Sequence, residues 1–120
     1  MENKQLEDRF NTALEKWSEH CKRNSHFSFD WPYLDCDAYR EIVSMGSEIL
    51  PLIRENYANE KGECGEPGAL WVHAIREIIG KDFEIRISDN DIGNIKKLKQ
   101  STLNWLDKNM SKYLQRITHN

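Results

Sequence analysis

Apolar residues recur at helical spacing from the start of the chain. Between residues 3 and 23 they follow one another at steps of four, four, three and four, which places them on one face of a helix. That face consists of Leu6, Phe10, Leu14, Trp17 and Cys21. Charged side chains occupy most of the positions between them and form the solvent-facing side. The pattern therefore predicts an amphipathic helix over residues 3–23.

A glycine divides the next helical segment in two. The apolar residues of 37–46 and of 47–57 each follow a helical period. Gly46 is expected to end the first helix, because glycine adopts the left-handed conformation at a helix C-terminus with little steric cost. Pro51 falls in the first turn of the second helix, where its missing N–H does little harm. The segment is therefore predicted to form an elbow or hairpin of two short helices.

The second half of the chain is predicted to contain a loop and two further helices. Residues 58–68 are rich in glycine, which is typical of a loop. The helix that follows ends at Gly80, and its apolar residues cover more than half of its circumference. We therefore expect it to be the central and most buried helix. The last helix begins after the Ser88–Asp91 segment and keeps its period to Ile117, either without interruption or with a restart near Ser111.

Residues 83–87 alternate between apolar and polar, which is the period of a half-buried strand. No second segment offers a partner strand, and an isolated strand is not stable. The segment is therefore expected to be an extended connection that packs on the helices.

Side chains able to cap a helix stand at three predicted helix starts. Asp35 or Asp37 is expected to accept hydrogen bonds from the free N–H groups of the second helix, and Ser47 from those of the third. Ser88 precedes Asp91 by three residues, which matches a capping box at the start of the last helix.

The connection at residues 25–36 is unusually aromatic. Pro32 disfavours the helical conformation for the residue before it, so this segment is expected to be extended. Two interpretations stay open: the rings fold back over the core, where large aromatics contribute most, or they form an exposed recognition patch. The aromatic residues are Phe27, Phe29, Trp31 and Tyr33. In the second interpretation Phe29, Trp31 and Tyr33 bind a partner, because tryptophan and tyrosine often dominate the binding energy of interfaces.

Length and charge narrow the class of protein. The 120 residues correspond to one ordinary domain, residues 1–120. A formal net charge of −3 argues against a general nucleic-acid binder. No apolar stretch is long enough to cross a bilayer, and the first residues lack the apolar core of a signal peptide. We therefore expect a soluble, cytoplasmic domain that does not enter a membrane.

The number and spacing of the cysteines also favour the cytoplasm. Their number is odd and their spacing irregular, whereas a small secreted domain stapled by disulfides normally carries an even set. Cytosolic glutathione keeps such thiols reduced. We therefore expect Cys21, Cys36 and Cys64 to be free.

No motif for metal binding or catalysis stands out. Cys64 and His73 are nine residues apart, and the group His20, Cys21 and His26 also lacks the close paired spacing of structural zinc sites. A calcium loop counted from Asp89 would need a glycine at its sixth position and an acid at its twelfth, and it has neither. No cysteine–histidine pair shows a local signature of nucleophilic catalysis, and no glycine-rich phosphate loop is present. No cofactor and no catalytic residue is therefore predicted.

Three lysines on the last helix could contact phosphate. Lys96, Lys97 and Lys99 belong to a net acidic chain, in which such a group is more often a solvated face. Nucleic acid is therefore an unfavoured partner.

The middle of the chain resembles known helical proteins. The run from Tyr39 to Gly46, followed by Ile49-Leu50-Pro51-Leu52-Ile53, is similar to a HEAT-type helix pair, in which a glycine turn leads into a helix with an early proline. With Trp71, Ala74-Ile75, Ile79-Gly80 and Trp105-Leu106 added, residues 37–107 resemble a group of small uncharacterised microbial proteins. After Gly80 the chain departs from that pattern, since Lys81-Asp82-Phe83 stands where a proline-rich connection is expected. The resemblance implies helical packing and no catalytic residues.

The sequence thus predicts an all-α, bundle-like domain of five helices with a HEAT-like elbow and no significant sheet. The expected function is a non-enzymatic protein-interaction module. A regulatory inhibitor of a nuclease or toxin, similar to an antitoxin, is the first alternative, because an acidic domain can occupy a basic partner. An undetected hydrolase or metalloprotein is the second.

Overall fold

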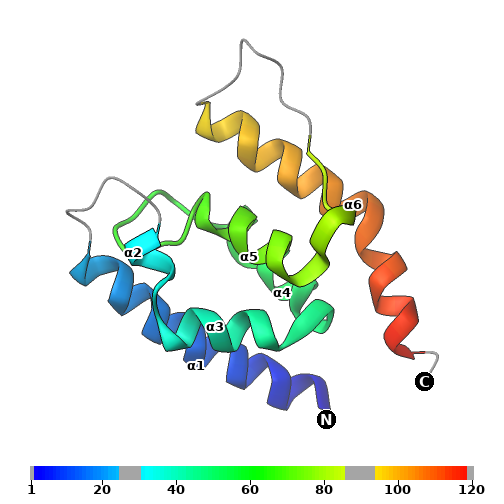
Figure 1. The fold of residues 1–120 in the computed structure, drawn as a ribbon, viewed down its shortest axis with the longest axis horizontal. Coiled ribbons are helices and arrows are strands. Elements are labelled where there is room, and N and C mark those ends of the chain that lie inside the picture. Colours follow the sequence, from blue (N-terminus) through cyan, green and yellow to red (C-terminus); the bar gives the residue numbers. More distant parts are fainter. Residues whose placement is uncertain (1, 25–30, 86–93, 119–120) are drawn as a thin grey trace.

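Helix α1 (Glu2–Arg23) forms one long side of the computed structural model, which describes residues 2–24, 31–85 and 94–118 (Figure 1). The described residues form helices, turns and extended connections and contain no strand, so the all-α prediction is confirmed. The five predicted helices are all present. The other elements are α2 (Trp31–Leu34), α3 (Asp37–Ser44), η1 (Gly46–Ile49), α4 (Leu50–Ala58), α5 (Leu70–Ile79), η2 (Gly80–Asp82) and α6 (Ile95–Thr118).

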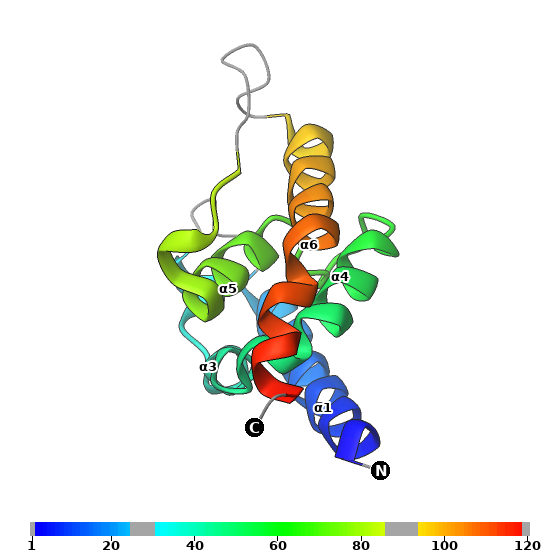
Figure 2. The ribbon, with the colours of Figure 1, turned by 90° about the vertical axis from the view of Figure 1, so that its right-hand side faces the viewer.

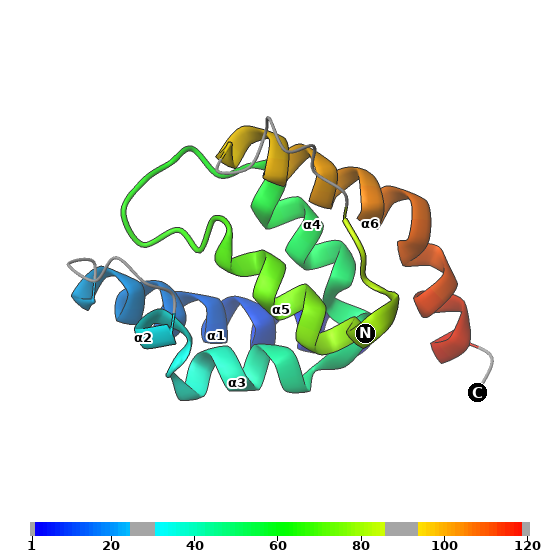
Figure 3. The same ribbon diagram turned by 45° about the horizontal axis from the view of Figure 1, so that its top comes forward.

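The helices pack with α5 at the centre. Helix α3 packs against both α1 and α5, while α6 runs along α4 and η1 on the opposite side (Figures 2 and 3). The predicted elbow at Gly46 is present, because φ is +78° at this glycine and α3 ends just before it. Helices α3 and α4 pack mainly on other helices, so the segment is an elbow and not a hairpin. The likeness to a HEAT pair stays a prediction.

An aromatic cluster joins α1, α3 and α5. Trp17 meets Trp71 edge to face, with ring centroids 5.2 Å apart, and lies 5.0 Å from the ring of Tyr39. Phe10 stacks on Trp71 at 6.0 Å. Offset and edge-on contacts of this kind stabilise a core beyond the area that they bury. The spacing of the first helix therefore placed its aromatic residues correctly, although Ala13 is buried where Leu14 was expected and Leu14 is only half-buried.

Helix α5 is the most buried helix, as predicted. Four of its ten residues are buried, namely Trp71, Val72, Ala74 and Ile75. It ends at Gly80, where φ is +85°. The helix begins at Leu70, directly after the glycine-containing loop and Ala69.

A second cluster fixes α6 to the end of α5. Phe83 is buried and packs edge to face on Trp105, whose ring also lies near Tyr113. The predicted extended connection is therefore present in its described part, residues 83–85. Helix α6 continues without interruption past Ser111, which settles the alternative left open by the sequence.

The predicted caps were wrong or lie outside the described residues. Cys36 occupies the N-cap of α3 and contributes no side-chain hydrogen bond, while the carboxylates of Asp35 and Asp37 both pair with Arg40. Ser47 lies inside the turn η1, so Ile49 and not a serine precedes α4. The Ser88–Asp91 capping box falls outside the described residues. Asn94 caps α6 instead, since its side-chain oxygen accepts a hydrogen bond from the N–H of Lys97 at 3.2 Å.

No helix in the described part of the chain is long and apolar enough to span a membrane.

Candidate functional site

A single helical turn, α2, presents the aromatic residues that the sequence singled out. The prediction of an extended segment was wrong for residues 31–34, which form this turn. Pro32 is its second residue. The N–H groups of the first residues of a helix have no hydrogen-bond acceptor within the helix, so the missing N–H of proline costs no hydrogen bond there. The turn is too short to be stable by itself, so its conformation depends on contacts with the rest of the fold.

Two side chains of α1 hold α2 in place. Trp17 Nε1 donates a hydrogen bond to the carbonyl oxygen of Tyr33 at 2.8 Å. His20 Nε2 lies 2.7 Å from the carbonyl oxygen of Pro32, and because a carbonyl only accepts, this ring nitrogen carries the proton. Both donors come from the face of α1 that is directed toward α2. The hydrogen bonds satisfy two carbonyls that a one-turn helix cannot pair internally.

Backbone N–H groups satisfy the remaining carbonyls of the turn. Asp35 donates to the carbonyl of Trp31 at 3.0 Å, and Cys36 donates to that of Leu34 at 2.9 Å. All four carbonyls of α2 therefore have partners. The turn is fixed in orientation, and so is the direction in which its side chains leave it.

The fixed turn leaves the Trp31 side chain outside the core. Trp31 is 65% exposed, whereas Pro32 is buried and Tyr33 is half-buried against the core. The structure thus separates the two interpretations by residue: Tyr33 helps to cover the core, and Trp31 does not. Phe27 and Phe29 lie outside the described residues.

A cavity of about 370 Å³ opens beside α2. Its walls come from the end of α1, from α2, from the loop that precedes α5 and from the first residue of α5. Apolar and acidic side chains line it, and no basic side chain does. The lining residues are Cys21, Tyr33, Glu63, Cys64, Gly65, Glu66, Pro67, Ala69 and Leu70.

The Glu66 carboxylate organises the loop at this cavity. It accepts hydrogen bonds from the backbone N–H groups of Lys61, at 3.0 Å, and Glu63, at 2.6 Å. Desolvation acts to raise the pKa of Glu66, but these backbone hydrogen bonds outweigh it and hold the pKa below its ordinary value. Glu66 is therefore ionised at neutral pH and is part of the loop framework. The local sequence does not distinguish Glu66 from Glu63, since both are acids of the same loop.

A second carboxylate ties the other end of the loop to α5. Glu60 accepts hydrogen bonds from Trp71 Nε1 at 2.7 Å and from the N–H of Gly68 at 3.0 Å. Burial raises the pKa of Glu60, while the Trp71 hydrogen bond opposes that shift. Two carboxylates thus fix the loop 59–69. Glu66 accepts hydrogen bonds from N–H groups within the loop, and Glu60 accepts them from Gly68 in the loop and from Trp71 in α5.

The middle of this loop contacts α1 directly. Gly65 has φ of +94°, and a Cβ atom built on it would lie 2.9 Å from Ser18 Oγ and 2.7 Å from Lys22 Cε. Glycine therefore permits both the backbone conformation and the close approach. This contact packs the 59–69 loop against α1, so that Gly65 and Cys21 line the same cavity.

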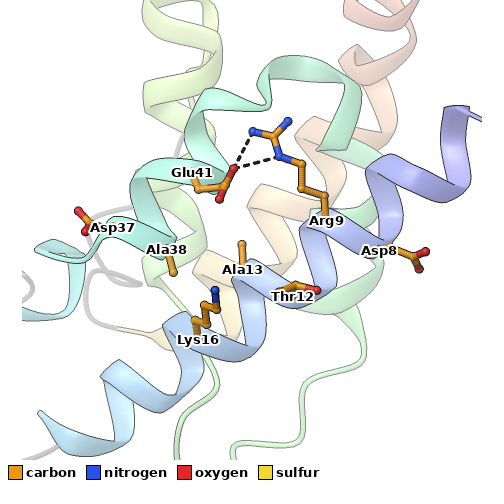
Figure 4. Close-up of a pocket in the computed structure, with 8 residues that line it drawn as sticks. All are labelled: Asp8, Arg9, Thr12, Ala13, Lys16, Asp37, Ala38 and Glu41. Atoms are coloured by element: carbon orange, nitrogen blue, oxygen red, sulfur yellow. Dashed lines mark hydrogen bonds and ion pairs between the residues drawn. The ribbon is translucent and has the colours of Figure 1, made fainter.

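A larger cavity of about 420 Å³ lies between α1 and α3 (Figure 4). Arg9 reaches across it to Glu41, and the two side chains form an ion pair at 2.6 Å. Its lining carries charges of both signs, with Lys16, Asp8 and Asp37 as the others. A surface of mixed charge with an internal ion pair favours no single class of ligand, so it is a weaker candidate than the cavity beside α2.

The residues considered for metal binding do not form a metal centre in the described part of the chain. No group of three or more histidine, cysteine, aspartate or glutamate side chains there could hold a metal ion. Cys21, Cys36 and Cys64 are all free thiols, and burial raises the pKa of Cys21 to about 12. A buried thiol with so high a pKa is a poor nucleophile. The calcium pattern at Asp89 lies outside the described residues.

The lysine group of α6 is partly engaged. The Lys99 ammonium lies 5.6 Å from the centre of the Tyr57 ring, which is the geometry of a cation–π interaction. Lys96 and Lys97 are exposed. Lys99 therefore differs in its surroundings from Lys96 and Lys97.

Comparison of the chain with protein-family models, with curated proteins and with solved structures finds no match in any of the three. The resemblance to small microbial helical proteins stays a prediction.

Proposed function

We propose that this chain is a non-enzymatic protein-interaction module, and that its partner binds at Trp31 and the neighbouring Tyr33. The observation that carries the proposal is the combination of a 65% exposed tryptophan with a turn whose four carbonyls are all paired. A side chain on a fixed backbone loses little conformational freedom on binding, which favours its use as an anchor.

The chemistry of the side chain supports the same function. Tryptophan is enriched among the residues that contribute most to protein–protein binding. Its ring offers a large apolar area together with an N–H donor, so it serves both the apolar centre and the polar edge of an interface. The cavity lined by Tyr33 supplies a concave surface at the same helical turn.

Site-specific photo-crosslinking in the cells that naturally contain the protein tests the proposal. An aromatic photoreactive amino acid, which keeps a large ring at the anchor position, replaces Trp31 in one variant and Ile95 in the other, since Ile95 is 69% exposed and lies on α6. The proposal expects a discrete crosslinked protein with the variant at position 31 and none with the variant at 95. Equal crosslinking at both positions, or none at position 31, would contradict it.

The acidic lining of the cavity favours one alternative function, a regulator that occupies the basic surface of a nuclease or toxin. Identification of the crosslinked protein separates the two. If it is a nuclease or toxin, the purified chain should reduce its activity in proportion to the complex formed. An unchanged activity would leave the general interaction module and remove this alternative.

A further inference from the structure

We propose that the cavity beside α2 receives a lysine or arginine side chain of the partner, with Glu63 as the carboxylate that meets its charge. The inference rests on the proposed function and adds to it the chemistry of the partner: a basic segment that contacts Trp31 and places a cationic side chain in the cavity.

The charge of the cavity is of one sign. Glu63 and Glu66 line it and no basic residue does. Glu66 is committed to the backbone N–H groups of its own loop. The Glu63 side chain is exposed and accepts no hydrogen bond from the described residues, so its carboxylate is available to a ligand. A concave surface with charge of one sign attracts the opposite charge and selects among partners.

Two lysines of the protein itself lie near this charge: Lys22 at the edge of the cavity, and Lys99, which helps to lower the pKa of Glu66. Lys22 lies against Gly65, where its stem covers the loop. Within the described ranges it forms no ion pair with Glu63 or Glu66, although other arginine–carboxylate pairs are present on the surface. Among the described residues Glu63 therefore takes part in no ion pair, and its charge is the one left for a ligand.

The apolar part of the lining matches the rest of such a side chain. Tyr33, Pro67, Ala69 and Leu70 supply the apolar wall of a cavity of about 370 Å³. Lysine and arginine bury their methylene stems against apolar surface while the charged group remains near water or a carboxylate. A neutral aliphatic side chain would use the wall and leave Glu63 unpaired, and an acidic one would be repelled.

The position of α2 connects the cavity with the proposed anchor. Tyr33 lines the cavity, and Trp31 stands two residues earlier in the same helical turn. The two side chains leave the turn on different sides, since residues two apart on a helix do not face each other, and Trp31 does not line the cavity. A partner that contacts both therefore passes around the turn, with a basic side chain at the cavity and an apolar side chain at Trp31.

Peptide titration of the uniformly ¹⁵N-labelled full chain tests the inference at low ionic strength. The probes are three acetylated pentapeptides with alanine and glycine flanks and lysine, norleucine or glutamate at the centre. Norleucine has a straight aliphatic chain like that of lysine and lacks the charge. We expect the lysine peptide to shift the amide signals of Tyr33 and residues 63–70, with an affinity about three- to fivefold above that of the norleucine peptide.

Two variants locate the carboxylate responsible. Glu63→Gln should bring the lysine and norleucine peptides to within about twofold of one another, because it removes the charge and keeps the backbone N–H that Glu66 uses. Glu48→Gln is the matched control, since Glu48 is an exposed carboxylate in η1, and it should leave the lysine preference intact.

Any of four results would overturn the inference: equal affinity for the lysine and norleucine peptides, shifts that map away from the cavity, no shift at about 10 mM peptide, or a lysine preference that survives Glu63→Gln. The failure of this inference and that of the proposed function are distinguishable. Photo-crosslinking at position 31 does not depend on the charge in the cavity, so it would still yield a partner if only the inference is wrong.

Discussion

Trp71 is fully buried in α5, where its ring packs on Trp17 and Phe10 and its Nε1 donates to Glu60. Trp71→Ala removes all of these contacts at once and leaves a cavity where α1, α3 and α5 meet. We expect the free energy of unfolding to fall by about 3–5 kcal/mol, measured by denaturant titration. A loss below about 1 kcal/mol would show that the centre of the core lies elsewhere.

The three thiols should differ strongly in reactivity. Cys64 is exposed and Cys21 is buried, with a pKa raised from 9.0 to about 12 by burial. Because the thiolate is the reacting form, a thiol reagent at pH 8 should modify Cys64 first and Cys21 more slowly by at least about a hundredfold. Mass spectrometry of the time course identifies each site. All three should react in denaturant, and equally fast modification of Cys21 and Cys64 in the native protein would contradict their placement.

Tyr57 carries a buried hydroxyl that finds no hydrogen-bond partner among the described residues. A buried polar group without a partner destabilises the folded state. Tyr57→Phe should therefore leave stability unchanged or raise it by up to about 1 kcal/mol at neutral pH. A clear loss would show that the hydroxyl is paired after all.

The raised pKa of Tyr57 also predicts how the stability of the fold changes with pH. Burial, with a smaller contribution from Glu60, raises the pKa of Tyr57 from 10.0 to about 12. Since the folded state keeps this proton longer than the unfolded state, stability is lost as pH rises from 10 toward 12. Unfolding experiments over that range should show a smaller alkaline loss in Tyr57→Phe than in the wild type.

At the scale of elements, the hydrophobic period was sufficient to predict α1, α3, α4, α5 and α6. It worked because each of these helices presents a continuous apolar face to the core. The stops at Gly46 and Gly80 were also predicted, since a positive φ is a local requirement that the residue type reveals.

The caps and α2 could not be predicted in the same way. Asp35 and Asp37 are capable of capping, but Arg40 takes both carboxylates. The preference against a helical residue before proline was overridden at Trp31, because Trp17 and His20 hold the carbonyls of the turn from another helix. Competition of this kind depends on tertiary contacts, which a local pattern does not contain.

Mutations in the loop 59–69 test whether tertiary contacts distinguish residues that look alike in the sequence. Glu66→Ala removes the acceptor of two backbone N–H groups and should lower the free energy of unfolding by about 1 kcal/mol. Glu63→Ala, in the same loop, should change it by less than about 0.5 kcal/mol. Because the pKa of Glu66 lies below its ordinary value, its contribution is present at neutral pH and is lost as pH falls through the folded-state pKa. Equal effects of the two variants at pH 7 would contradict the assigned roles.

At the scale of the whole molecule, the candidate site exists only after folding. Its cavity draws on residues 21, 33 and 63–70, three segments that are far apart in the sequence. The composition of the aromatic connection showed that this segment was unusual. Of the three predicted binding residues, Tyr33 lines the cavity, Trp31 is exposed in the same helical turn, and Phe29 lies outside the described residues. The loop carboxylates were not distinguishable, because only the folded backbone shows which of them accepts its N–H groups.

The central claim is that Trp31 belongs to a binding surface and not to the core. The direct measurement compares wild type and Trp31→Ala in two respects, the free energy of unfolding and the affinity for the partner identified by crosslinking. We expect unfolding to change by less than about 1 kcal/mol, and the affinity to fall by about tenfold or more. An unchanged affinity, or a loss of stability of several kcal/mol, would contradict the claim.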